Sequence, residues 1–257
     1  LKDFKFERIK GGKNNKEFLL KNKSGKKFFL KQYYHSKNDD RNRLKSEWDF
    51  IDFIDRLDIN QTPKNIYKDD KLGLGLYSFV NGKKIETNEI LEEHIKQIAN
   101  FIIGINNYSQ GARFSNFASD YNSSIQSFIK SVDWRVKNLI FSKNLNLKFK
   151  NKLIQLKNTI NRLWRNEKNK INSEFSLSEI KQNSQLYLSP SDIGFHNILI
   201  DKKKLFFIDF EYSGLDDLVK LINDFFICPS ASIPNNLREN FILELNKSFK
   251  FDNFFYR

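Results

Sequence analysis

The amino-terminal part of the chain alternates short apolar runs with polar turns. Residues 4–9, 17–21 and 27–33 are rich in aromatic and branched side chains, and glycine, asparagine and lysine fill the segments between them. Short alternating runs bounded by such turn residues predict β-strands. Three of them in succession predict an antiparallel meander at the start of the chain.

Apolar residues at helical spacing follow the third predicted strand. They are Leu44, Trp48, Ile51 and Ile54. This spacing predicts a helix over residues 41–57, and we expect Asp39 or Asp40 to cap it. Between this helix and the next ones, a run ending in Asn-Gly reads as a buried strand and turn.

The middle of the chain is predicted to be helical. Asn88 is placed to cap a helix whose apolar face carries Leu91, Ile95, Ile98, Ile102 and Ile105. Residues 121–141 and 148–164 show similar spacing, and we expect Trp134 and Trp164 to lie in the core.

Strand-like patterns return near residue 200. Residues 197–200 and 205–208 are two apolar runs rich in branched and aromatic side chains, separated by an aspartate and three lysines. Two such runs joined by a short polar turn predict a β-hairpin. The hairpin would bring Asn197, at the start of the first strand, beside Asp209, at the end of the second.

Polar residues with chemical potential gather around this hairpin. Asp192 lies in the loop before the first strand, where Gly194 allows an unusual backbone path. Asp192, Asn197 and Asp209 are therefore expected to converge. This arrangement suits phosphoryl transfer, in which one carboxylate orients the attacking hydroxyl while an amide and a second carboxylate hold Mg²⁺ on the nucleotide phosphates.

The same region resembles the phosphotransferase family of aminoglycoside and choline kinases, which are relatives of the protein kinases. That family has an Asp-x-x-x-x-Asn loop followed by an Ile-Asp-Phe-Glu-Tyr-like metal motif, and both are present here. The resemblance implies that Asp192 is the catalytic base. It implies that Asn197 and Asp209 bind Mg²⁺.

The resemblance extends less closely to other residues. It implies that Asp224 braces the catalytic loop, whereas Glu211 and Asp217 either support the metal site or face water. Many relatives have histidine where this chain has Pro190, a departure that fits a subgroup marked by Ser-Pro-Ser-Asp. His196 either shapes the acceptor site or serves packing or solvation.

The fold implied by the resemblance is α+β, bilobal and protein-kinase-like. The expected amino-terminal lobe, residues 1–80, is a small antiparallel sheet with one helix that binds the nucleotide. The expected carboxyl-terminal lobe, residues 81–257, is mostly helical, carries the catalytic hairpin and binds the acceptor. ATP would lie between the lobes, with Mg²⁺ on its phosphates.

Two charged residues of the first lobe match the pattern of nucleotide-binding kinases. Lys31 lies near the end of the third strand and would pair with the α- and β-phosphates. Glu47 is the only glutamate in the following helix and is the expected partner of Lys31, with Asp49 and Asp52 as alternatives.

The backbone is expected to supply the other nucleotide contacts. Gly11 and Gly12 form a short, incomplete glycine-rich loop whose amides could meet phosphate. Residues Ser78, Phe79 and Val80 resemble the segment that connects the lobes, where backbone groups would meet adenine.

Composition limits the alternatives. The 257-residue chain has a formal net charge of +13, yet its lysines are spread out, and the run of three at residues 202–204 lies in the predicted turn. A solvated basic surface is therefore favoured over a nucleic-acid-binding protein. The single cysteine, Cys228, excludes an intramolecular disulfide framework and indicates a reducing, cytoplasmic location. No apolar stretch approaches the roughly 20 residues of a membrane span.

The predicted activity is transfer of the γ-phosphate of ATP to a hydroxyl of a small molecule. The acceptor could be a sugar or polysaccharide precursor, an amino alcohol or an aminoglycoside, while the oligomeric state is not indicated. A protein acceptor is disfavoured because no Ala-Pro-Glu motif follows Asp209. The alternatives are a pseudokinase scaffold that binds nucleotide and regulates a partner, and a basic nucleic-acid-binding protein.

Overall fold

A computed structural model describes most of the chain. The described residues are 4–9, 14–36, 39–107, 114–139, 147–182, 185–228 and 233–251. The predicted phosphate-loop residues Gly11 and Gly12 lie outside these ranges. The chain forms two compact units: Leu1–Tyr121 with Leu186–Arg257 is the first, and Asn122–Gln185 is the second. The predicted lobe boundary at residue 80 falls inside the first unit and stays a prediction.

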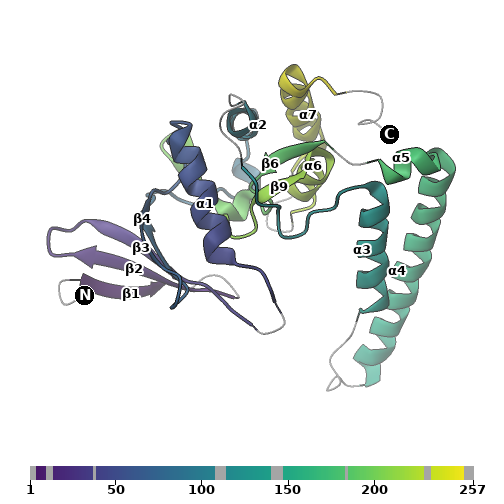
Figure 1. Ribbon diagram of the computed structural model, residues 1–257, viewed down its shortest axis with the longest axis horizontal. Coiled ribbons are helices and arrows are strands. Elements are labelled where there is room, and N and C mark those ends of the chain that lie inside the picture. Colours follow the sequence, from purple (N-terminus) through teal and green to yellow (C-terminus); the bar gives the residue numbers. More distant parts are fainter. Residues whose placement is uncertain are drawn as a thin grey trace. The chain divides into compact units, whose positions relative to one another are not determined.

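A five-stranded antiparallel sheet forms the amino-terminal part of the first unit (Figure 1). Its strands are, in spatial order, β1 (Phe4–Ile9), β2 (Lys16–Asn22), β3 (Lys27–Gln32), β5 (Leu74–Ser78) and β4 (Asn65–Asp69). The three predicted strands are confirmed. Strand β5 coincides with the buried run before the Asn-Gly turn, and β4 was not predicted.

The single helix of this part, α1 (Arg43–Arg56), packs against β4 and β5. It starts two residues later than predicted, because Asn42 caps it: the Asn42 side chain accepts a hydrogen bond from the Lys45 amide at 3.0 Å. The expected cap by Asp39 or Asp40 is therefore wrong. Its buried side includes the predicted Leu44, Ile51 and Ile54, together with Glu47, Phe50 and Phe53.

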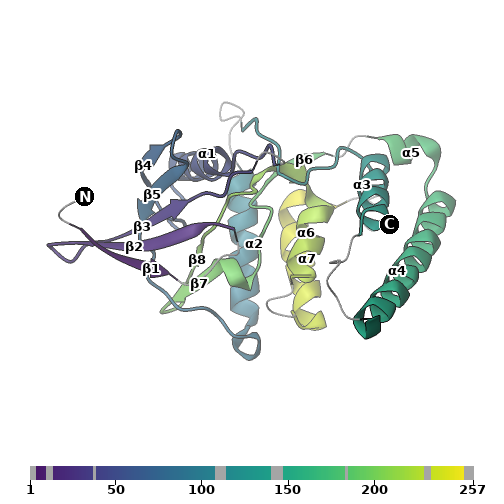
Figure 2. The same cartoon turned by 90° about the horizontal axis from the view of Figure 1, so that it is seen from below.

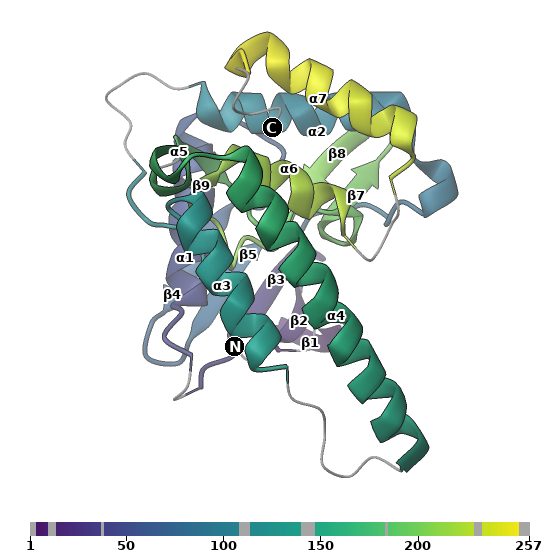
Figure 3. The same cartoon turned by 90° about the vertical axis from the view of Figure 1, so that its right-hand side faces the viewer.

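Helices and two small hairpin-like sheets make up the rest of the first unit. The helices are α2 (Glu92–Asn106), α6 (Leu218–Phe226) and α7 (Asn235–Phe249), with short 3₁₀ turns at Thr87–Glu89 and Phe195–Asn197. The strands are β6 (Leu186–Ser189) with β9 (Gly214–Asp217), and β7 (Ile198–Asp201) with β8 (Lys204–Phe207). Helices α2 and α7 run side by side (Figure 3), and α2 also lies against β8.

The apolar face predicted for α2 is largely the buried one. Ile95, Ile98, Ile102 and Ile105 are fully buried, which anchors the helix in the core. Leu91 instead serves as the N-cap residue and is 59% exposed. Asn88 lies in the preceding 3₁₀ turn, so its predicted capping role is wrong.

His94 makes the start of α2 sensitive to pH. Its Nδ1 accepts a hydrogen bond from the Leu91 amide at 3.2 Å, and burial lowers the pKa of its imidazole. Protonation removes the acceptor and favours the unfolded chain, so stability is full above the unfolded pKa of about 6.5 and falls as the pH drops below it. We expect the thermal midpoint to fall between pH 7.5 and 5.5 more in the wild type than in His94→Gln. Equal slopes in the two proteins would contradict this.

The second unit is helical. It contains α3 (Ile125–Lys137), α4 (Leu147–Glu174) and α5 (Leu177–Lys181), and α3 and α4 lie alongside each other (Figure 3). Asp133 on α3 accepts hydrogen bonds from Trp164 Nε1 at 2.8 Å and Lys168 Nζ at 2.6 Å on α4. Trp164 is thus partly buried between the helices, whereas Trp134 is 66% exposed, so its predicted core position is wrong. No helix within the described ranges has both the length and the apolar character needed to cross a bilayer.

Candidate active site

A cavity of about 660 Å³ opens in the first unit, bordered by the sheet, the segment after β5 and the β7–β8 region. Every predicted site residue in the described ranges lines it: Lys31, Glu47, Ser78, Phe79, Val80, Asp192, Asn197 and Asp209. These residues come from positions up to 178 residues apart in the chain. The fold therefore assembles the predicted groups around one space.

The β7–β8 hairpin places Asn197 and Asp209 beside each other. Ile198 pairs with Phe207 and Asp201 with Lys204, so a two-residue turn closes the hairpin. Just beyond the paired strands, the Ile208 amide donates to the Asn197 carbonyl at 3.0 Å. This bond extends the ladder by one step and fixes the two metal-ligand candidates at the same end of the hairpin, as the sequence predicts.

The backbone at two positions of the site is unusual. Ser191 has φ = 65° and Asp209 has φ = 67°, which is the left-handed region. Non-glycine residues adopt it at a cost and persist there only where the surroundings fix them. One such position immediately precedes Asp192 and the other is Asp209 itself, so the fold holds both candidate carboxylates in specified directions.

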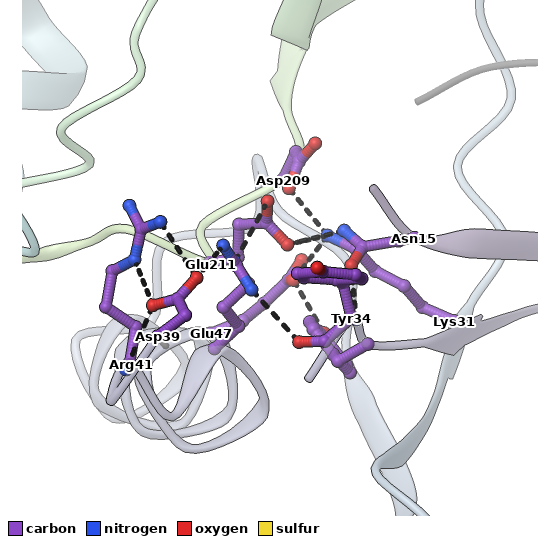
Figure 4. Close-up of polar contacts among 10 residues, drawn as sticks. Asn15, Lys31, Tyr34, Asp39, Arg41, Glu47, Asp209 and Glu211 are labelled. Atoms are coloured by element: carbon purple, nitrogen blue, oxygen red, sulfur yellow. Dashed lines mark hydrogen bonds and ion pairs between the residues drawn. The ribbon is translucent and has the colours of Figure 1, made fainter. Parts of the chain in front are cut away.

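Lys31 is the centre of the charged network (Figure 4). Its Nζ lies 2.8 Å from Glu47 Oε2, 2.6 Å from Asp209 Oδ1 and 3.6 Å from Glu211 Oε2, and only 1% of the side chain is exposed. Burial lowers the pKa of Lys31, but the opposing negative charges outweigh this and raise it well above the usual range. Lys31 is therefore a permanent cation at the wall of the cavity. The predicted pairing with Glu47 is confirmed; Asp49 instead pairs with Lys45.

Two buried tyrosines hold Glu47 in place, and the sequence gave no signal for them. Tyr33 Oη donates to Glu47 Oε2 at 2.6 Å, and Tyr33 and Tyr77 hydroxyls lie 2.7 Å apart. The ring of Tyr33 also faces Lys31, whose Nζ is 4.9 Å from the ring centroid. The Lys31–Glu47 pair is thus anchored on β3, α1 and β5 together.

Glu211 points inward and does not face water, since only 5% of it is exposed. Asn15 donates to it from the turn between β1 and β2, and Arg43 Nε lies 3.9 Å from it (Figure 4). Arg43 is fixed in turn by Tyr34 and Asp39. Glu211 therefore belongs to the charged wall of the cavity.

The two other acidic candidates have structural partners. Asp217 caps α6, where its carboxylate accepts from the Lys220 amide at 3.0 Å. Asp224 pairs with Lys220 Nζ at 2.8 Å, and Lys220 also binds the fully buried Asp216 at 2.8 Å. These contacts organise α6; the bracing role expected for Asp224 stays a prediction.

Asp192 has one carboxylate oxygen engaged. Its Oδ1 lies 3.1 Å from His196 Nε2, while the side chain remains 47% exposed. The hydrogen bond with His196 lowers the pKa of Asp192 and, together with the contact to Cys228, raises the pKa of His196 to about 10. At neutral pH the pair is a carboxylate and an imidazolium, so Asp192 can receive a hydrogen bond from a ligand hydroxyl.

The sequence also missed Lys84 and Glu17. Lys84 lies beyond the predicted hinge, lines the cavity and donates to the His196 carbonyl. Glu17 on β2 lines the same cavity, and burial raises the pKa of its carboxyl. Neither residue falls in a motif or at a diagnostic spacing, so only the folded chain identifies them.

The chain was compared with known proteins. A family model described as the phosphotransferase enzyme family matches residues 5–254. Among curated protein sequences, no match was found.

Solved structures give the same picture for the fold. Choline kinase from Cryptosporidium parvum Iowa II matches 99% of this chain and 77% of its own, with a TM-score of 0.65 and 16% identity. The ternary complex of streptomycin, ATP and APH(2")-IIa matches 96% of this chain and 78% of its own, with a TM-score of 0.64 and 16% identity. Choline kinase LicA from Streptococcus pneumoniae matches 95% and 75%, with a TM-score of 0.62 and 16% identity. The α+β kinase-like fold is confirmed, and the family match over nearly the whole chain shows that this protein belongs to the phosphotransferase enzyme family, as a small-molecule kinase.

Proposed function

We propose that this kinase transfers the γ-phosphoryl group of ATP to a hydroxyl of a small molecule, with Asp192 as the base. The observation that carries the proposal is the convergence of Lys31, Asp192, Asn197 and Asp209 on one cavity. Phosphoryl transfer demands little covalent work from a protein, so positioning and charge neutralisation supply most of the catalysis.

Lys31 would bind the α- and β-phosphates. It carries a fixed positive charge, and Glu47 with its tyrosine partners holds the ammonium at one place. Asp209 would exchange its contact with Lys31, 2.6 Å in the ligand-free protein, for a metal ion. Glu47 then keeps the lysine in position while phosphate oxygens replace the lost carboxylate.

The donor set fits Mg²⁺. Asn197 and Asp209 offer a carbonyl and a carboxylate oxygen, and Mg²⁺ takes its remaining ligands from phosphate and water. When bound, the ion neutralises charge on the phosphates. Asp192 would orient the acceptor hydroxyl through its free carboxylate oxygen and accept its proton.

Adenine is proposed to lie against residues 78–80. Ser78 lines the cavity, but its amide donates to the Lys64 carbonyl at 2.9 Å, and its hydroxyl accepts from the Lys64 amide at 2.8 Å. The expected backbone contact of Ser78 through its N–H is thus already used within the sheet. The polar backbone contacts to the base are assigned to Phe79 and Val80.

Phosphate transfer from ATP to hydroxylated metabolites tests the proposal. Sugars, amino alcohols such as choline, and aminoglycosides would be offered with Mg²⁺, and ADP formation and the phosphorylated product would be measured. We expect one acceptor class to give product in the wild type and not in Asp192→Asn. Product from the wild type and the variant at equal rates would contradict the proposed base, and ATP binding that ignores Mg²⁺ would contradict the proposed metal ligands.

A further inference from the structure

The catalytic loop contains a chain of three side chains that the phosphoryl-transfer motif does not explain. His196 Nε2 lies 3.1 Å from Asp192 Oδ1, and His196 Nδ1 lies 3.2 Å from Cys228 Sγ. Both ring nitrogens of His196 are therefore engaged, one by the proposed base and one by a buried thiol at the end of α6. A ring held at two points on opposite sides has a defined plane.

The backbone beneath His196 is also fixed. The residue lies in the 3₁₀ turn Phe195–Asn197, which is closed by the Asn197 amide donating to the Gly194 carbonyl at 2.8 Å. Phe195 and Asn197 on either side are buried. His196 therefore cannot shift without moving the core or the proposed metal ligand.

Gly194 leaves the room that the contact between His196 and Cys228 needs. A Cβ atom there would lie 2.4 Å from Cys228 Sγ and 2.8 Å from His196 Nδ1, both too close for any side chain. The φ of Gly194 is −167°, which any residue adopts. The requirement for glycine at this place in the loop is thus steric and comes from the histidine–cysteine contact.

We propose that His196, oriented by Cys228, is the positioning residue of the active site: it holds one carboxylate oxygen of Asp192 so that the other faces the acceptor hydroxyl. The inference rests on the proposed function of Asp192. His196 acts through Asp192, and Cys228 acts through His196. The histidine lies four residues after the base and next to Asn197, so a single turn positions both the base and a metal ligand.

Two amide substitutions separate the two contacts of the ring. In His196→Gln the longer side chain brings its amide near the position of Nε2 and keeps a donor for Asp192. In His196→Asn the amide lies near the position of Nδ1 and does not reach Asp192. We expect kcat to fall about 10-fold or more in His196→Asn and His196→Ala, within the range for loss of a positioned group, and to be largely retained in His196→Gln. KM for ATP should stay close to wild type in all three. His35→Ala, which removes an exposed histidine, is the matched control.

A double-substitution cycle tests the role of Cys228. Cys228→Ser keeps a hydrogen-bonding atom and Cys228→Ala does not, so we expect kcat to fall only in the second. The combination His196→Ala/Cys228→Ala should lose no more activity than His196→Ala alone, because both changes remove one chain of contacts. Fully additive losses, equal kcat in the Gln and Asn variants, or an effect confined to KM for the acceptor would each overturn the proposal.

Thermal unfolding separates this inference from the proposed function. If the wild type transfers no phosphate to any acceptor, the proposed function fails, yet the contact itself is still measurable. The losses in Tm of Asp192→Asn and His196→Ala should then not add in the double variant if the two side chains interact. Strict additivity would show that His196 does not hold Asp192, whatever reaction the protein catalyses.

Discussion

Asp192→Asn should lower kcat for phosphate transfer by about 10²–10⁴-fold, the usual effect of losing a positioned general base. The amide keeps the size of the carboxylate and can still accept from His196 Nε2, which lies 3.1 Å from Oδ1 in the native protein. It carries no charge and accepts no proton from the acceptor hydroxyl. KM for ATP should change little, because Lys31 and Asp209 remain in place. Steady-state kinetics with the acceptor found by the screen measure both constants.

A matched control is available in the same hairpin. Asp201→Asn removes an exposed carboxylate at the turn end of β7, away from the cavity, and should leave kcat unchanged. Unfolding curves for both variants confirm that the fold persists. Near wild-type turnover in Asp192→Asn would show that another group takes the proton.

Lys31→Met should remove nucleotide binding and also weaken the fold. The lysine neutralises Glu47, Asp209 and Glu211, and both Lys31 and Glu47 are almost completely buried. Breaking a buried ion pair by removing one partner typically costs about 3–5 kcal/mol in the free energy of unfolding. Denaturant unfolding measures the loss of stability, and titration with ATP in the presence of Mg²⁺ measures the loss of binding.

Two further variants distinguish the causes. Lys21→Met removes an exposed lysine of the neighbouring strand β2 and should change neither property. Lys31→Met/Glu47→Gln removes one of the buried negative charges as well, so part of the stability should return while ATP binding stays lost. If binding returned together with stability, Lys31 would be needed only for the fold and not for phosphate.

The local pattern of the sequence predicts the catalytic hairpin closely. Strands β7 and β8 lie within one residue of the predicted runs, and the bond from the Ile208 amide to the Asn197 carbonyl brings the expected ligands together. This succeeds because a hairpin is a local structure whose register follows from alternation and turn length. The same holds for the first three strands of the sheet.

Helix starts were predicted less well. Asn42 and Leu91 occupy the N-cap positions of α1 and α2, where aspartates and Asn88 were expected. Several polar residues near each start have the right chemistry for a cap, so the choice depends on which turn packs against the core. Trp134 shows the same limit: helical spacing gives a face but not what covers it.

The sequence by itself determined the kinase-like fold class, the hairpin and most of the residues that meet at the cavity, because motif residues keep a fixed spacing along a locally folded segment. Only the tertiary structure decided which groups surround them. The tyrosines behind Glu47, the enclosure of Glu211 by Asn15 and Arg43, and the contact of His196 with Cys228 join residues that are from 14 to 196 positions apart. Such contacts depend on how strands and helices pack across the core, and no local periodicity or spacing records that packing.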